Sequence, residues 1–125
     1  MIVLKRETDV ENIISICKEE NVEYADNVGV FVARDRDEIL GYSLFFVGQS
    51  LAIKNVKTPL VLWKSIGDGL FRATINFAIE NGISTATMEQ SLLEKLTGDI
   101  IPEDKATAVV EDCEKFLEEI KRCKR

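Results

Sequence analysis

Three glycines mark the segment of this chain whose residue types best suit binding chemistry. Gly67 and Gly69 lie two residues apart at the start of an apolar helical pattern, and Gly82 ends it. Closely spaced glycines at the start of a helix let backbone N–H groups approach a phosphate. The same glycines can instead be packing residues inside a longer helix, because Thr58 and Pro59 upstream also form a good helix start. The sequence leaves both interpretations open.

Composition limits the chemistry that this chain can perform. Its 125 residues predict one domain, residues 1–125, and its net charge of −6 argues against a nucleic-acid partner. The absence of histidine removes histidine-based catalysis and the commonest metal ligand, so we expect no metal site. Three cysteines without a Cys-x-x-Cys pair indicate reduced thiols in a cytoplasmic protein. No apolar run reaches the roughly 20 residues of a membrane span, so we expect no membrane partner.

Hydrophobic periodicity and turn residues predict the elements that position these glycines. Thr8 and Glu11 form a capping box for a helix that ends near Asn21. A long helix that starts either at Pro59 or near Ile66 ends at Asn81, a short helix covers 91–96, and an amphipathic helix covers 102–125. The predicted strands cover residues 2–4, 28–33, 39–47, 51–56 and 83–88. This order predicts an α+β fold in which a mixed, mainly antiparallel sheet is flanked by helices.

The order of elements and three local sequences resemble the GNAT superfamily of acyl-CoA-dependent N-acetyltransferases. Residues 32–35 and 38–42 are similar to the second and third strands of the family and their connecting turn. Residues 64–69 resemble its pyrophosphate motif, Gln/Arg-x-x-Gly-x-Gly/Ala, and residues 93–96 resemble its Tyr-Glu-Lys-Leu segment. The resemblance covers about residues 1–98 and implies a single GNAT-like domain. Here the C-terminal helix takes the place of the family's last strands.

The resemblance implies a site for acyl-CoA between the strands at 51–56 and 83–88. Its phosphates would be held by Lys64 and by the backbone at Ile66, Gly67, Asp68 and Gly69, and further backbone donors would come from Ala52 and Ile53. Lys64 stands where the family has Gln or Arg, and Leu93 stands where a tyrosine is often the general acid. Glu89 and Tyr42 are the candidates for proton transfer.

Three hypotheses about function follow. The first is an N-acyltransferase that acetylates an unidentified small-molecule amine. The second is a non-catalytic GNAT-like protein that binds a ligand or pairs with itself as a homodimer, which the broad apolar surface of the helix at 59–81 favours. The third is a small structural α+β protein. The start of the long helix separates the first two hypotheses, because a start near Ile66 leaves N–H groups free for phosphate and a start at Pro59 does not.

Overall fold

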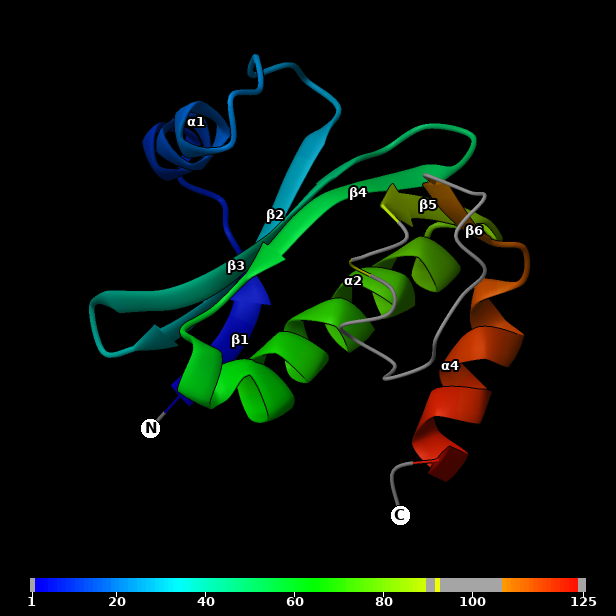
Figure 1. Cartoon of the computed structure of the whole chain (residues 1–125). Helices are drawn as coiled ribbons and strands as arrows, with labels where there is room; N and C mark the ends of the chain where they lie inside the picture. The colour runs from blue at the N-terminus through cyan, green and yellow to red at the C-terminus, as the bar shows by residue number, and fades with distance from the viewer. Residues whose placement is uncertain (1, 90–91, 93–106, 124–125) are drawn as a thin grey trace.

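The structure is a computed structural model that describes residues 2–89, Leu92 and residues 107–123 (Figure 1). Its strands are β1 Ile2–Arg6, β2 Val28–Asp35, β3 Glu38–Phe46, β4 Leu51–Lys57, β5 Ala86–Glu89 and β6 Thr107–Val110. Its helices are α1 Val10–Glu19, α2 Asp68–Glu80 and α4 Cys113–Cys123, and two short helical turns, Leu60–Leu62 and Trp63–Gly67, precede α2. Of the short helix expected over 91–96, only Leu92 lies within the described residues.

The six strands form one sheet in chain order, from β1 at one edge to β6 at the other. Every neighbouring pair is antiparallel except β4 and β5, which are parallel and are joined through α2. Figure 1 shows α1 on one face of this sheet and α2 and α4 on the other. The predicted fold class, α+β with a mixed and mainly antiparallel sheet, is confirmed.

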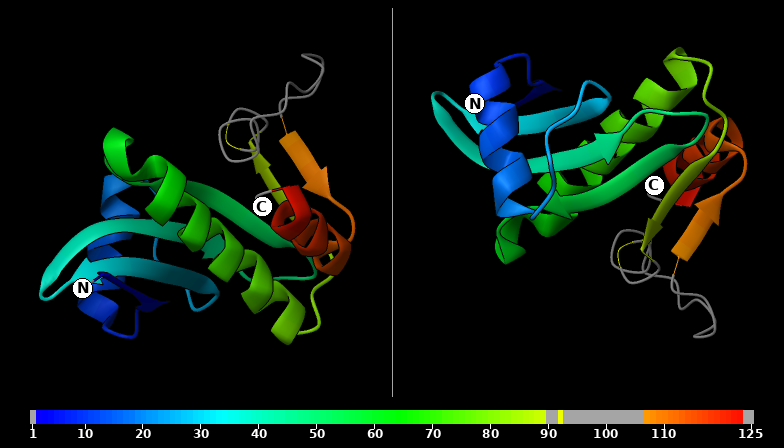
Figure 2. Two further views of the ribbon diagram at one scale, coloured as in Figure 1. Left: turned by 90° about the horizontal axis from the view of Figure 1, so that it is seen from below. Right: turned by 90° about the horizontal axis from the view of Figure 1, so that it is seen from above.

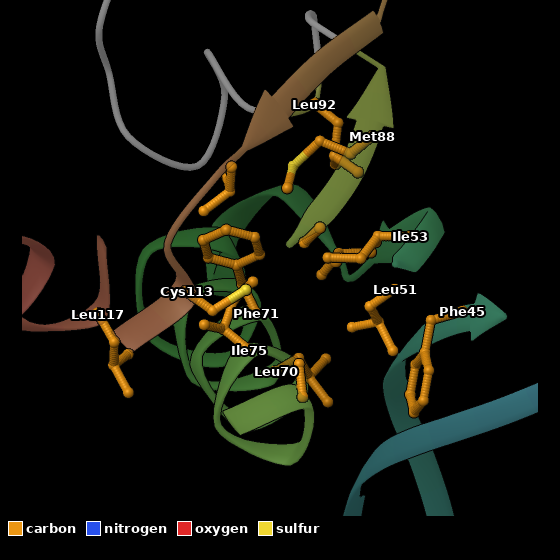
Figure 3. Packing of buried hydrophobic residues seen from close by; sticks show 14 of the residues in the cluster. Phe45, Leu51, Ile53, Leu70, Phe71, Ile75, Met88, Leu92, Cys113 and Leu117 are labelled. Carbon is orange, nitrogen blue, oxygen red and sulfur yellow. The ribbon is translucent and has the colours of Figure 1, made fainter. Parts of the chain in front are cut away.

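Two hydrophobic cores hold the three layers together. The side chains of α1 pack on Val30, Val32 and Leu44, all fully buried on one face. On the opposite face α2 packs on a larger cluster that includes Phe45, Leu51 and Ile53 and extends to Met88 and Leu92 (Figure 3). The rings of Phe71 in α2 and Phe116 in α4 meet edge to face, with centroids 5.9 Å apart. Helix α4 therefore extends the second core beyond α2.

The C-terminal helix is shorter than the sequence predicts. Within the segment 102–125, residues Thr107–Val110 form strand β6 beside β5, so one additional strand is present where only a helix was expected. β-branched Thr107, Val109 and Val110 suit a strand. The helix begins only after Asp112, whose carboxylate accepts a hydrogen bond from the Lys115 N–H at 3.1 Å, as an N-cap does.

The start of α1 also differs from the prediction. The N-cap is Asp9, whose side chain accepts from the Glu11 N–H at 3.0 Å, and not Thr8. The reason is that the Glu7 carboxylate already accepts hydrogen bonds from the N–H groups of Thr8 and Asp9. The expected capping box between Thr8 and Glu11 is therefore wrong by one residue.

A buried pair of hydroxyl groups ties α2 to the sheet and gives a first prediction. Thr74 Oγ1 lies 2.7 Å from Ser43 Oγ and 2.8 Å from the Leu70 carbonyl oxygen, and both hydroxyl residues are fully buried. Thr74→Val leaves the Ser43 hydroxyl without this partner, so urea unfolding should show a loss of about 1–3 kcal/mol. Adding Ser43→Ala should recover part of that loss. A double variant no more stable than Thr74→Val would contradict the role of the pair.

Candidate functional site

Strands β4 and β5 pair over a short distance and then separate. Their pairing consists of Leu51 opposite Ala86 and Ala52 opposite Thr87, although β4 continues to Lys57. The right-hand view of Figure 2 shows β5 running away from β4 after this short contact. From Ile53 onward, the edge of β4 on this side has no partner in β5. The two parallel strands diverge beyond this point, and we call this divergence the opening between β4 and β5.

Strand β4 is also irregular where the opening begins. Phe45 of β3 lies opposite Ile53, but the preceding Leu44 lies opposite Asn55, so Lys54 is an extra residue on β4. Such a bulge bends the strand and increases its twist. The Ile53 side chain is buried in the core under α2, whereas Lys54 is exposed. Of the two expected backbone donors on this strand, Ala52 pairs with both neighbouring strands and Ile53 is the first residue past β5.

The connection from β4 to α2 is helical from Leu60 onward, so the early helix start near Pro59 is observed and the later start near Ile66 is not. Helical turns begin at Leu60, and the second of them, Trp63–Gly67, is π-helical and leads directly into α2. The Asp68 N–H contacts the carbonyl oxygens of Trp63 and Ser65, so it is already engaged within the helix. Gly67 has helical dihedral angles, φ −60° and ψ −46°. The backbone at 66–69 is therefore helix interior, and a phosphate bound there stays a prediction.

The two glycines make room for neighbouring side chains. A Cβ atom on Gly67 would lie 3.0 Å from the Trp63 ring, and one on Gly69 would lie 2.9 Å from the Leu4 Cδ2 atom of β1. Close packing accounts for both glycines without a ligand.

Three other residues of the predicted phosphate motif have different surroundings. Ile66 is buried in the core under α2, and Lys64 is exposed. The Asp68 carboxylate is largely buried and pairs with Arg72, with Oδ2 and Nε 3.0 Å apart. Lys64 is thus the cation of this motif that solvent can reach.

Alanine at the two glycines should separate their roles. Both substitutions favour helix by up to about 1 kcal/mol. At Gly69 the new methyl group meets the movable end of Leu4, so Gly69→Ala should keep or raise stability. At Gly67 it presses on the ring of Trp63, the single tryptophan of the chain. Gly67→Ala should therefore shift the tryptophan emission spectrum and Gly69→Ala should not; equal spectra would contradict this packing.

On the other face of the sheet, Tyr42 lies at the centre of a polar cluster. The Tyr42 side chain is 5% exposed, and its hydroxyl contacts Oε2 of both Glu19 and Glu20 at the end of α1. Lys57 Nζ donates to Glu19 Oε2 at 2.7 Å, and Asn55 Nδ2 donates to Glu20 Oε2 at 3.0 Å. Two carboxylates thus converge on one phenol oxygen, with one lysine to balance them.

The contacts in this cluster shift the pKa values of its members. Burial and the neighbouring carboxylates raise the pKa of Tyr42 far above its usual value. Hydrogen bonds from Lys57 and Tyr42 lower the pKa of Glu19, and the Glu19 carboxylate raises the pKa of Lys57. At neutral pH, Tyr42 is therefore held as a hydrogen-bond donor and Glu19 as an anion.

A cavity of about 480 Å³ adjoins this cluster. One wall is a face of α1, the other is the first half of β3, and the chain at Lys57, Thr58 and Pro59 forms the rim. Ile16, Ile39 and Leu40 supply apolar parts of the lining. Its polar residues are Asn12, Ser15, Glu19, Tyr42, Lys57 and Thr58. A volume of this size and a mixed lining are typical of a small-molecule site.

The expected proton-transfer residues do not come together. Tyr42 lies under α1, whereas Glu89 is an exposed residue at the end of β5. The sequence reasoning missed Glu19 and Glu20, the carboxylates that surround Tyr42. No short spacing could have found them, because the contacts join residues 22 and 23 positions apart. Leu93 lies outside the described residues, and no three potential metal ligands converge among those described.

Titration should distinguish Tyr42 from a solvent-exposed tyrosine. Its folded-state pKa lies above its unfolded value, so it stabilises the fold below about pH 10 and this contribution is lost as pH rises further. Alkaline titration of the folded protein, followed by tyrosinate absorbance, should therefore lack the Tyr42 signal until the chain unfolds. Tyr42→Phe should leave the folded-state titration curve unchanged and reduce only the signal of the unfolded chain. A smaller folded-state signal in Tyr42→Phe would contradict the buried hydrogen bonds.

Comparisons with known proteins bear on the fold. No sequence model of a protein family matches this chain, and neither does any curated protein. Solved structures do match. An IAA acetyltransferase from Bacillus cereus aligns with a TM-score of 0.58 at 18% identity, over 77% of this chain and 71% of that protein. A GNAT-family acetyltransferase from Staphylococcus aureus aligns with a TM-score of 0.51 at 16% identity, over 78% and 77%.

A third match is a Bacillus subtilis acetyltransferase solved in complex with CoA, with a TM-score of 0.54 at 19% identity, over 88% of this chain and 97% of that one. The chain has the GNAT fold. In this GNAT fold a single helix, α1, covers its face of the sheet among the described residues. No helix in the described ranges is long and apolar enough to cross a bilayer.

Proposed function

We propose that this GNAT-fold chain is an N-acyltransferase that binds acyl-CoA in the opening between β4 and β5. The observation that carries the proposal is the separation of these two strands after Ala52 and Thr87. It leaves an extended backbone edge from Ile53 to Lys57 without a partner in β5. Such an edge can bind an extended ligand that contains amide groups, as an added strand binds. The amide-bearing arm of acyl-CoA has that chemistry.

The residues present fit the two parts of acyl-CoA unequally. The β4 edge suits the amide arm. The phosphates meet a helix whose N–H groups at 66–69 lie in its interior, and Lys64 is the exposed cation that remains for them. When bound, the cosubstrate supplies an activated acyl group. The chain supplies position, and a backbone N–H of β4 beyond the segment paired with β5 is suited to polarise the acyl oxygen.

The acceptor in this proposal is a small-molecule amine held in the cavity between α1 and β3. Lys57 pairs with Glu19 alone, and Tyr42 supplies one phenol proton to the two carboxylates, so the cluster carries net negative charge and favours a further cation. Glu19 lies in the cavity wall, where its carboxylate can bind an ammonium group and accept its proton. Tyr42 positions both carboxylates through its hydroxyl.

A specific observation favours a second candidate, a GNAT-fold protein that pairs with a second copy without turnover. The helical turns that begin at Leu60 occupy backbone groups that a phosphate would need. They also expose Val61, whose side chain is 90% accessible, beside the half-buried Leu62 and Trp63. Such an exposed apolar segment is typical of an interface between proteins.

Calorimetry with a whole ligand and a fragment tests the acyl-CoA site. Acetyl-CoA and acetylpantetheine should both bind, because both contain the amide arm. Lys64→Ala should weaken the binding affinity for acetyl-CoA by about two- to fivefold, which is the usual contribution of an exposed ion pair. The affinity for acetylpantetheine should not change. Lys18→Ala on α1 is the matched control. No heat with either compound at millimolar concentration would overturn the proposed site.

Turnover and assembly separate the two candidates. Thiol release from acetyl-CoA in the presence of a panel of primary amines should show activity that Glu19→Gln reduces. Sedimentation measures whether the chain is a monomer or a dimer. A dimer that binds ligand but releases no thiol with any amine, and that Val61→Asp dissociates, would favour the second candidate instead.

A further inference from the structure

A second cavity, of about 380 Å³, lies at the β1 edge of the sheet and is lined by Val3, Lys5, Arg34 and Arg36. Three of its four lining residues carry a positive charge, in a chain whose net charge is −6. We propose that this cavity binds a phosphate dianion, either inorganic phosphate or a small phosphomonoester.

The cavity lies on the face of the sheet that α1 partly covers. Leu4 of β1 reaches Gly69 near the start of α2, and the Arg6 guanidinium stacks over Phe77 of α2 at 4.4 Å from the ring centroid. Because side chains alternate along a strand, Val3 and Lys5 point to the opposite face. Arg34 lies directly across from Val3 in the pairing of β1 with β2. The phosphate cavity and the opening proposed for acyl-CoA therefore involve different surfaces.

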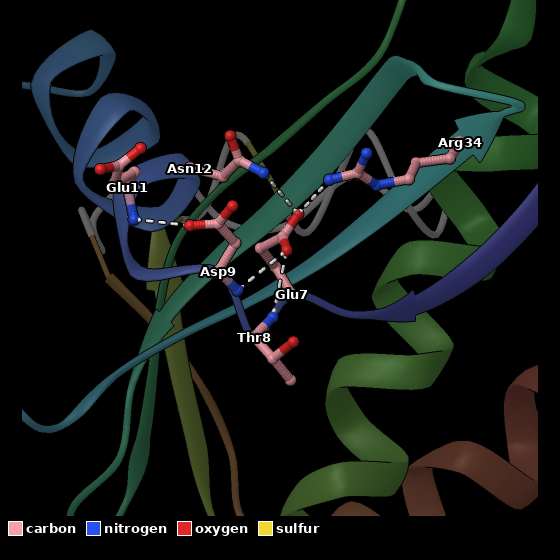
Figure 4. A network of polar contacts seen from close by, with 6 residues as sticks. All are labelled: Glu7, Thr8, Asp9, Glu11, Asn12 and Arg34. Atoms are coloured by element: carbon pink, nitrogen blue, oxygen red, sulfur yellow. Dashed lines mark hydrogen bonds and ion pairs between the residues drawn. The ribbon is translucent and has the colours of Figure 1, made fainter.

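Arg34 is held in place before any ligand arrives. Its guanidinium donates to Glu7 Oε2, and the Glu7 residue is 8% exposed (Figure 4). The other Glu7 oxygen accepts from the N–H groups of Thr8 and Asp9, both at 3.1 Å. Figure 4 shows these donors gathered around one carboxylate. A guanidinium has five N–H groups, so an anchored Arg34 keeps donors for a second anion.

The ionisation of Glu7 maintains its ion pair with Arg34. Burial tends to raise the pKa of Glu7, but the hydrogen bond and charge of Arg34, together with the N–H groups of Asp9 and Thr8, outweigh it and lower the pKa. Glu7 is therefore ionised at neutral pH. It neutralises one positive charge of the cavity and orients Arg34.

Two positive charges remain without compensation. In the described part of the chain, neither Lys5 nor Arg36 forms an ion pair, and both side chains are exposed. Arg36 stands in the turn between β2 and β3 with a positive φ of 59°. Asp37 and Glu38 follow it but do not line the cavity. The three cationic lining residues and Glu7 together carry two net positive charges, which match in number the two negative charges of a phosphate dianion.

The chemistry of the lining selects phosphate among anions. Guanidinium groups bind tetrahedral oxyanions through paired N–H donors, and an ammonium adds a point charge without a fixed direction. Two arginines and one lysine offer more donors than a monovalent carboxylate can use. A dianion therefore gains more from this set than acetate or chloride does.

Titration of the full-length chain, followed by amide NMR shifts, tests the proposal. Inorganic phosphate and glycerol 3-phosphate are the probes, and sodium chloride and acetate at matched ionic strength are the controls. Saturable shifts at Val3, Lys5 and residues 34–36 are expected, with affinity several-fold tighter at pH 8 than at pH 5.5, because both probes lose their second acidic proton between these two pH values. Shifts that are linear, or that chloride reproduces, would overturn it.

Variants on exposed positions keep the fold intact. Arg36→Asn suits the positive φ of this residue, and combined with Lys5→Gln it should weaken phosphate binding at least tenfold. Lys18→Gln, an exposed lysine of α1 outside the cavity, should leave it unchanged. Equal affinities for the double variant and this control would refute the site. Because the titration contains no CoA, a failure of acyl-CoA binding does not affect its outcome.

Discussion

The central hairpin of β2 and β3 is apolar on both faces, and the rest of the structure depends on covering both. Val30, Val32 and Leu44 are fully buried on one side, and Ala33 and Phe45 are fully buried on the other. A sheet with one buried face needs one covering layer of helices, whereas a sheet that is buried on both faces needs two. Helix α1 supplies the first layer and α2 the second. Both candidate sites arise where these layers stop.

The opening between β4 and β5 follows from how the second layer is connected. The chain leaves β4, crosses the sheet as α2 and returns as β5, which makes the two strands parallel neighbours. Strand β5 has only four residues, its other edge is paired with β6, and β4 bends at Lys54. The pairing therefore ends after two residues while the core of Ile53, Met88 and Leu92 fills the α2 side. This arrangement leaves the edge of β4 beyond Ile53 without a partner in β5.

The elements with strong periodicity could be read from the sequence, and so could their order. Strands 28–33, 39–47 and 51–56 and the helices near 10–20 and 59–81 all have counterparts, because each has an apolar face that must be buried. The strand Thr107–Val110 could not be predicted, since the spacing of Val109, Val110 and Cys113 fits a helix as well as a strand. Pairing with β5, which is not local in sequence, decides it. The hydrophobic pattern of neighbouring residues does not indicate that β5 is the partner of this segment.

The candidate site also combines residues that the sequence identifies with contacts that only the tertiary structure shows. Gly67 and Gly69 are visible in the sequence, but their role depends on Trp63 and Leu4, which fill the space that a Cβ would need. Tyr42 was a candidate, but Glu19 and Glu20 reach it only because α1 ends above β3. Such convergence depends on tertiary structure, so charge and spacing alone could not reveal it.

The segment that leads into α2 connects the proposed acyl-CoA site with the cavity between α1 and β3. A helix attracts anions through its first unpaired N–H groups, and this attraction declines within a turn. The turns Leu60–Leu62 and Trp63–Gly67 move those groups upstream, away from the glycines and toward Pro59, which lines the cavity beside Glu19. The unpaired N–H groups at the start of the helical turns therefore adjoin Pro59 and not Gly67. In the proposed acyltransferase, the added turns occupy the N–H groups at 66–69 that the diphosphate of acyl-CoA would need, so recognition of the cosubstrate would fall mainly to the β4 edge.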